Sequence, residues 1–495
     1  MYYFYTTTKG QKPQRDVFYD FKGKKLTGEV LDELNYQFMR RLEKEGFLTL
    51  KELYIDGTKL EANANRYTFV WRGSLNYHLA GLLDTIDALY TKYNAFLLDN
   101  GYGPKYDLGD AHMFVIEGMD KVRKIIQKNR ERKLTKHKKI PNNTIIEIDH
   151  CSPLEIRKLQ KNLMRIAEGE GIEFVFGKGM RKPEIQKLYE GLEECGKRLM
   201  EYKECFKIMG KDRNSYSKTD LEATFMRMKE DHMMNGQLKP AYNVQIAVEN
   251  YFIVHGYVSN DRTDYNTLIP VLEKHRKAFG DKLEAVTADS GYCSEKNLLY
   301  LKENRIRSFI KLQDHEKRKT RAYKEDIGKY YNMTYAVFEN EHYYICHDGR
   351  ELHHIRTESK EQDGYTQTVE VYGCADCSEC EYKSKCLYKY NPEKNPDQNK
   401  VMKINERWEE LREESNTNIQ SEEGILKRQT RSIQTEGHFG DIKENENFRR
   451  FNYRSKEKVY KEFMLYAIGR NIMKYHRFLH QEIEKFEGKK EQEAA

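Results

Sequence analysis

Three acidic residues stand out among the 79 of this 495-residue chain because of where they lie. Asp56 lies within or at the end of an apolar run (YIDGT), and Asp289 directly follows another (VTADSGY). Glu436 lies in RSIQTEGHFGDIK, a segment with no proline that is expected to be helical. Carboxylates at strand ends point into the crevice outside the carboxyl edge of a sheet, where ligands bind, and a helix packed across that edge can add a third acid.

Three converging carboxylates cannot all ionise in one place without a counter-cation, and hard oxygen ligands suit Mg²⁺ or Mn²⁺. Two such ions about 3.5–4 Å apart activate an attacking oxygen and stabilise the leaving oxygen of a phosphodiester. The predicted chemistry is therefore metal-dependent cleavage or transfer of phosphodiesters. Spacing alone leaves the choice of acids open, because Asp220, Asp261 and Asp264 also lie close to predicted strands and could serve as the first acid.

A second candidate site is a cluster of cysteines with the pattern C-x2-C-x2-C-x5-C, formed by Cys374, Cys377, Cys380 and Cys386. Four thiolates at such spacing bind Zn²⁺ tetrahedrally and close a structural site. An iron–sulfur cluster is the alternative, but the proline expected after the last cysteine is replaced by Leu387. Zinc is therefore favoured. The remaining cysteines are predicted to be plain core or loop residues: Cys151, Cys195, Cys205, Cys293 and Cys346.

The elements that must position these residues are visible as hydrophobic patterns. A strand running into a turn at Asp56-Gly57-Thr58 is predicted first, and a mixed α/β unit follows further along the chain. Its predicted order is a hairpin at 242–258, a helix at 264–279, a strand at 283–288, a helix at 295–304 and a strand at 306–312. Two apolar stripes with a period of about 3.5 residues, at 75–96 and 185–209, predict long coiled-coil-like helices.

Composition limits the class of protein. The 36 Tyr and 22 Phe supply enough apolar material for a core, which excludes wholesale disorder. The net charge of +7 permits a polyanionic partner without requiring one. No apolar run is long enough to cross a bilayer, and the N-terminus does not resemble a secretory signal, so a soluble protein of a reducing cytosol with no membrane partner is expected.

Four segments together resemble the DDE transposases of bacterial insertion sequences, in the branch with a cysteine-rich insert before the final glutamate. They are YIDGTKLEANANRYTFVW, RNSYSKTDLEATFMRMKEDHMMNGQLKPAYNVQIAVE, VTADSGYCSEKN and RSIQTEGHFGDIKENENFRRFNYRSKEKV. The resemblance implies an RNase H-like core with Asp56, Asp289 and Glu436 as catalytic metal ligands. It also implies hydrolysis at transposon ends, attack of the freed 3′-hydroxyl on target DNA, and a cytoplasmic, nucleoid-associated location in a bacterium.

The same family often shows a Tyr-Arg-Glu-Lys pattern around the last acid. Glu436 and Lys443 match it, whereas Gln429 and Ser432 occupy the first two places. Lys443 is expected to clamp phosphate, with the nearby Arg428 and Arg431 as substitutes for the missing arginine. Further basic residues, interleaved with aromatic ones, suit a surface that grips the DNA backbone: Arg449, Arg450 and Arg454. The expected partners are double-stranded DNA at terminal inverted repeats and target sites, and a second copy of the chain in a synaptic dimer.

These readings combine into an α/β chain whose RNase H-like mixed-sheet core is interrupted by a helical insertion and a small zinc-knuckle β insertion. The expected parts are 1–50, a partial N-terminal helical region; 51–71, the first core strands; 72–210, the helical insertion; 211–312, the core; 313–400, the insertion with four cysteines; and 401–485, C-terminal helices. Since only about ten residues precede the resembling stretch, an N-terminally truncated, catalytically inactive DNA-binding remnant is the alternative function. A coiled-coil scaffold is a third reading, but it leaves the strand-end acids unexplained.

Overall fold

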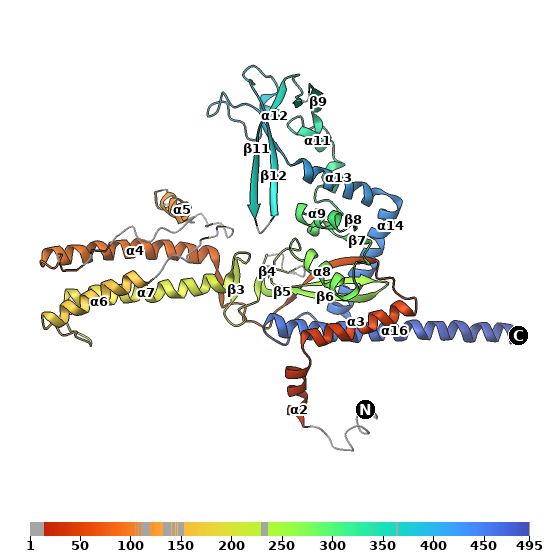
Figure 1. The fold of residues 1–495 in the computed structure, drawn as a ribbon, viewed down its shortest axis with the longest axis horizontal. Helices are drawn as coiled ribbons and strands as arrows, with labels where there is room; N and C mark the ends of the chain where they lie inside the picture. Colours follow the sequence, from red (N-terminus) through yellow and green to blue (C-terminus); the bar gives the residue numbers. More distant parts are fainter. Residues whose placement is uncertain are drawn as a thin grey trace.

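The computed structural model describes residues 14–494 except 104, 107, 110–118, 132–139, 141–143, 145, 147–152, 229–235, 340, 363 and 364. The architecture is mixed α/β, with a central mixed sheet, a helical arm and a second, antiparallel sheet (Figure 1). Two short helical segments, α2 (Arg15–Asp20) and η1 (Phe21–Lys25), precede these parts. Among the described helices, none is both long and apolar enough to cross a membrane.

The central sheet has the strand order β4-β5-β1-β7-β8, and β6 pairs with β5. Its strands are β1 (Glu52–Glu61), β4 (Thr224–Arg227), β5 (Leu238–Glu249), β6 (Phe252–Ser259), β7 (Ala285–Ala288) and β8 (Arg307–Ile310). β5 is antiparallel to β1 and to β6, whereas β1, β7 and β8 are parallel. The mixed sheet predicted from the hydrophobic runs is confirmed.

One prediction for this sheet is wrong. A turn was expected at Asp56-Gly57-Thr58, but β1 continues through these residues to Glu61. The reason is pairing with β5, which runs without a break from Tyr54↔Val248 to Glu61↔Ala241. The ladder of hydrogen bonds outweighs the local turn preference of the Asp-Gly pair.

Helices cover the central sheet on two sides. They are α3 (Gly28–Lys44), α8 (Leu268–Phe279), α9 (Glu295–Glu303), α13 (Glu406–Gln420), α14 (Glu422–Arg431), α15 (Gly437–Gly440) and α16 (Lys456–Ala494). Residues of α3, α8, α9 and α13 form one buried cluster with the sheet, around Ile55 and Val286. Residues of α15 and α16 form another, around Val244 and Ile246. Because successive side chains of a strand point to opposite faces, these two cores fix the face on which each strand residue lies.

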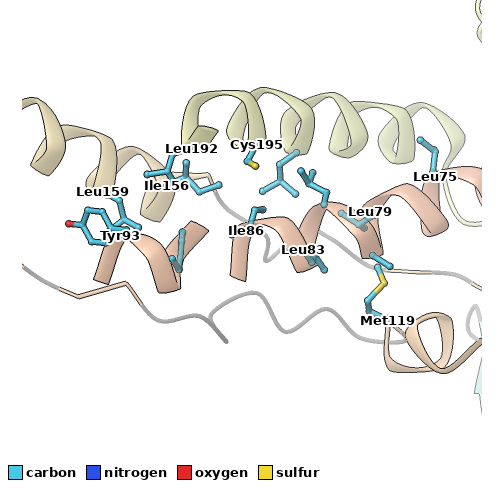
Figure 2. Close-up of a cluster of buried hydrophobic side chains, with 14 of the residues drawn as sticks. Leu75, Leu79, Leu83, Ile86, Tyr93, Met119, Ile156, Leu159, Leu192 and Cys195 are labelled. Atoms are coloured by element: carbon cyan, nitrogen blue, oxygen red, sulfur yellow. The ribbon is translucent and has the colours of Figure 1, made fainter. Parts of the chain in front are cut away.

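The helical arm consists of α4 (Arg72–Asp99), α5 (Met119–Glu131), α6 (Leu154–Gly169) and α7 (Glu184–Met209). α4 leads away from β2 (Phe69–Trp71), α7 leads back to β3 (Ser215–Ser217), and these two strands pair at the base. Figure 2 shows side chains of α4, α6 and α7, among them Ile86 and Cys195, meeting between the helices in one buried cluster. The apolar stripes of α4 and α7 therefore pack into a core within one chain.

The second sheet has the order β13-β12-β11-β10-β9 and is antiparallel throughout. Its strands are β9 (Thr334–Phe338), β10 (Glu341–Ile345), β11 (Glu351–Gln362), β12 (Tyr365–Cys374) and β13 (Val401–Ile404). Short helices lie around it: α10 (His315–Arg318), α11 (Arg321–Lys324), η3 (Tyr330–Asn332) and α12 (Lys383–Cys386). Residues 401–404 differ from the helix expected there, because Met402 and Ile404 alternate with exposed residues and pack into the core of this sheet.

A pair of buried histidines lies between β6 and α8. His255 Nε2 lies 2.9 Å from His275 Nδ1, and His275 Nε2 lies 3.1 Å from the Leu50 carbonyl oxygen. Both imidazoles are fully buried, and burial lowers the pKa of His275 to about 4. Burial also lowers the pKa of His255 well below its usual value.

These depressed pKa values predict that the fold loses stability in mild acid. Between about pH 6.5 and pH 4 these histidines are protonated in the unfolded chain but remain neutral in the folded chain. As the pH falls through this range, the free energy of unfolding therefore decreases by up to about 1.4 kcal/mol per pH unit for each histidine. Urea unfolding at pH 7, 6 and 5 should show this slope, and His275→Gln should reduce it. The exposed His78 gives the matched control, since His78→Gln should leave the slope unchanged. An identical slope in His275→Gln and the unmodified chain would contradict the prediction.

Candidate active site

The register of the central sheet places Asp56 beside Asp289. The last parallel pair between β1 and β7 is Ile55↔Ala288, so the two acids occupy the next position on neighbouring strands. Since side chains alternate along strands, two residues at the same level leave the sheet on the same side. Asp289 directly follows β7 and caps the short turn η2 (Ser290–Tyr292), where its Oδ1 accepts a hydrogen bond of 2.8 Å from Gly291 N–H.

Asp56 is only 6% exposed, and its donors include a backbone N–H, a hydroxyl and a guanidinium. Its Oδ1 accepts from the Gly57 N–H at 2.8 Å. Its Oδ2 accepts from Thr435 Oγ1 at 3.2 Å and forms an ion pair with Arg431 Nη1 at 3.1 Å. A carboxylate this buried requires a nearby positive charge, and the guanidinium supplies it.

Glu436 lies near Asp56 and belongs to the helical segment that follows α14. The helix changes winding here, with π-helical turns at Ser432–Glu436 (η4) and Asp441–Asn445 (η5) on either side of α15. Such wide turns shift the phase of the side chains and are frequent at functional sites. Arg431 Nη2 lies 3.7 Å from Glu436 Oε1, so one guanidinium spans Asp56 and Glu436.

The three acids predicted from the sequence border one cavity of about 300 Å³. Its lining consists of Asp56, Thr58, Asp289, Arg431, Glu436, Phe439, Gly440, Lys443 and Glu444. Over the described part of the chain, no three His, Cys, Asp or Glu side chains are arranged to hold a metal ion. The cavity nevertheless fits a divalent cation in its chemistry, because its donors are carboxylate oxygens and a cationic group already lies between two of them.

A fourth acid, Asp264, lies beside Asp289. A Cβ added to Gly291 would lie 2.9 Å from Asp289 Oδ1 and 3.1 Å from Asp264 Oδ2, so both side chains contact this glycine. Asp264 Oδ1 accepts hydrogen bonds from Asn243 at 2.7 Å and from Gln245 at 2.9 Å. The sequence offered Asp264 only as an alternative first acid, whereas the structure places it against Gly57 and Gly291, outside the lining of the cavity. Its neighbours come from β5, a relation that no local pattern reveals.

The other two alternatives lie elsewhere. Asp220 accepts from the Tyr242 hydroxyl at 2.9 Å in a buried position, and Asp261 Oδ2 accepts from Ser259 Oγ at 3.2 Å. Neither is among the residues that line the cavity.

The burial of Tyr292, with its hydroxyl donating to Gln245, raises its pKa well above the usual value, and the charges of Asp264, Asp56 and Asp289 add to the rise.

The basic residues predicted to contact DNA lie partly inside and partly outside the cavity. Arg431 and Lys443 line the cavity, while Arg428 is absent from its lining. Arg449 is exposed next to the cavity and pairs with Glu444 at 2.5 Å. Arg450 and Arg454 both bond to Asn63, just beyond the end of β1. The rings interleaved with them are mostly structural, because Phe451 is 2% exposed and Phe448 stacks on Tyr466.

Comparison with known protein families gives one match, in the C-terminal part of the chain. Residues 345–476 match the family model described as a transposase DDE domain. The matched segment contains Arg431, Glu436 and Lys443, whereas Asp56 and Asp289 precede it. No curated protein and no solved structure matches the chain. A transposase DDE domain indicates a DNA-transposing enzyme, and enzymes of this kind generally use divalent metal ions.

The cysteine cluster also lies within the transposase DDE match. All four predicted cysteines line a second cavity, of about 20 Å³, and Cys346 lines it with them. The sequence analysis treated Cys346 as a plain core or loop residue. Its link to the cluster depends on the β10–β11 turn, in which Gly349 adopts a φ of +77° and its N–H donates to the Cys346 carbonyl oxygen at 2.9 Å.

The bridging guanidinium leads to a prediction about metal binding. Arg431→Gln removes the ion pair between Arg431 and Asp56, which should lower the free energy of unfolding by about 2 kcal/mol in chelator. The same change removes a competing cation, so Mn²⁺ should raise the melting temperature more in this variant than in the unmodified chain. Arg428→Gln, in the same helix but outside the cavity, should change neither quantity. Equal Mn²⁺ responses of all three proteins in thermal unfolding would refute the role given to Arg431.

Proposed function

We propose that the protein is a DDE transposase of a bacterial insertion sequence, which cleaves DNA at the transposon ends and joins the freed 3′-hydroxyl to target DNA. The observation that carries the proposal is that Asp56, Asp289 and Glu436, up to 380 positions apart in the chain, border one cavity. The match of residues 345–476 to a transposase DDE domain supports it independently of the geometry.

The strand order supports an RNase H-like core. An antiparallel pair, β5 and β6, lies on one side of β1, and the parallel strands β7 and β8 lie on the other. In this arrangement the first and fourth core strands are neighbours and present Asp56 and Asp289 side by side. The helix carrying Glu436 packs against β1 and β5.

Five residues of the cavity have a role in this proposal: Asp56, Asp289, Glu436, Lys443 and Arg431. Asp56, Asp289 and Glu436 would hold Mg²⁺ or Mn²⁺, which activates the attacking oxygen and stabilises the leaving one when bound. Lys443 lies in the same cavity and would bind a phosphate oxygen, as an ammonium group does well. Arg431 would turn from Asp56 to the phosphodiester once the carboxylates have another counter-charge. Asn243 and Gln245 donate hydrogen bonds to Asp264, which lies near Asp289 but outside the lining of the cavity.

The partners follow from the reaction. Double-stranded DNA carrying the terminal inverted repeats is the proposed substrate, with Arg449, Arg450 and Arg454 as backbone contacts outside the cavity. Two ends must be held together for transposition, so we infer a homodimer in the synaptic complex. A structural Zn²⁺ in the cysteine cluster completes the proposed cofactors.

A cleavage assay tests the proposal. The protein with Mg²⁺ should cut a DNA fragment that carries the terminal repeats flanking its gene. Asp56→Asn, Asp289→Asn and Glu436→Gln should each reduce the rate about a thousand-fold, a loss of about 4 kcal/mol of transition-state stabilisation. Glu444→Gln is the matched control, since Glu444 lines the same cavity but is not a proposed ligand, and it should cut at nearly the normal rate.

A mobility-shift assay with the same fragment separates the two functions. The inactive variants should still bind the repeats, which shows that chemistry rather than folding or binding is lost. Specific binding by the unmodified protein without any cleavage would instead establish the non-catalytic DNA-binding alternative. Full cleavage by any one of the three carboxylate variants would refute the proposed active site.

A further inference from the structure

Five cysteines surround the small cavity at one end of the second sheet. Cys346 follows β10, Cys374 ends β12, Cys377 and Cys380 lie in the next loop, and Cys386 ends α12. All five are free thiols. The cavity volume of about 20 Å³ accommodates roughly one water-sized particle. A zinc ion takes four thiolates, so one of the five is in excess.

Two lysines, Lys383 and Lys400, line this cavity together with the cysteines. Lys383 is only 6% exposed, and its Nζ donates to the Pro396 carbonyl at 2.6 Å. The Lys400 Nζ donates to the Gly328 carbonyl at 2.6 Å and to that of Cys386 at 3.1 Å. Lys383 interacts electrostatically with the exposed Asp376, and neither ammonium group lies within ion-pair distance of a carboxylate of the described residues. Withdrawing such charges from water is costly unless an opposite charge is close. Four thiolates on one Zn²⁺ carry a net negative charge that two lysines would balance.

Cys386 lies near three of the other cysteines. Its side chain interacts electrostatically with Cys346, Cys377 and Cys380, as well as with Lys400. The Cys377 sulfur accepts a hydrogen bond of 3.4 Å from the Lys400 backbone N–H, and a backbone N–H at Tyr382 bonds to the Cys380 sulfur. Sulfur atoms that accept from backbone N–H groups are placed to act as thiolates.

Cys374 is placed differently. Its thiol donates a hydrogen bond of 3.2 Å to the Asp376 carbonyl oxygen, which requires that the proton remain on sulfur. The residue pairs with Leu352 across the β11–β12 ladder, and it shares the buried apolar cluster around Tyr372 with Cys377. A metal ligand must instead be deprotonated and free to turn toward the ion.

We propose that Cys346, Cys377, Cys380 and Cys386 bind one Zn²⁺ and that Cys374 is a packing residue. Cys346 thereby replaces Cys374 in the ligand set expected from the spacing. Since no three of these thiols yet lie at ligand spacing in the described structure, side-chain rotation must bring them to the Zn–S distance of about 2.3 Å. The bound ion would connect the β10–β11 turn to α12. The proposal is independent of the catalytic function.

Metal analysis of the full-length chain tests the ligand set. The unmodified protein, purified from zinc-supplemented culture, should contain about one zinc per chain. Cys374→Ser should retain it, and Cys346→Ser should bind it at least about tenfold more weakly. Cys346→His should keep the metal, and its Co²⁺ form should change from the absorption of four sulfur ligands to that of three sulfurs and one nitrogen.

Several results would overturn the proposal. They are a zinc-free unmodified protein, iron with acid-labile sulfide in its place, loss of zinc in Cys374→Ser, and unchanged zinc affinity in Cys346→Ser. If Cys346→Ser does not fold, the Co²⁺ spectrum of Cys346→His decides the question. An unchanged four-sulfur spectrum in that variant would show that Cys346 is not a ligand.

Discussion

The pairing of β1 between β5 and β7 is the constraint on which the candidate site depends. β7 is parallel to β1 over only four residue pairs and ends at Ala288, so Asp289 leaves the sheet at the level of Asp56. β5 accompanies β1 beyond this point and keeps Asp56 in extended backbone. A shift of the β1–β7 register by one residue would move Asp56 to the opposite face, because side chains alternate along a strand. The apolar residues Ile55 and Val286, buried in one core, oppose such a shift.

This register also creates an electrostatic problem. It brings Asp56, Asp289 and Glu436 to one cavity, and Asp264 lies nearby against Gly57 and Gly291, outside the cavity lining. Arg431 offsets part of the repulsion by contacting Asp56 and Glu436 at once, and the hydrogen bonds from Thr435, Asn243 and Gln245 offset more. The guanidinium can therefore act as the counter-ion of the protein alone, and a divalent ion would compete with it for the same oxygens.

The parts that could be predicted from the sequence are those encoded locally. Runs of apolar residues gave the strands and helices of the central unit, and the acids directly after or within those runs gave Asp56 and Asp289. The errors come from contacts made at long range. The Asp-Gly pair in β1 is extended only because β5 lies beside it, and β13 is a strand only because it pairs with β12. The positions of Asp264 and Cys346 likewise depend on strand pairing, so spacing along the chain could not reveal them.

A single buried carboxylate explains how the second sheet is held against the core that it interrupts. Glu295, at the start of α9, is 6% exposed. It accepts hydrogen bonds from Gln367 in β12 at 3.2 Å, from Asn405 after β13 at 2.6 Å and from Arg407 in α13 at 3.0 Å. These bonds fix the point at which the chain returns from the insertion to α13. Since α14 and Glu436 follow directly, the position of the third acid depends on this connection as well as on its own helix. Among the described residues, the buried cluster of the helical arm is separate from those of the central sheet.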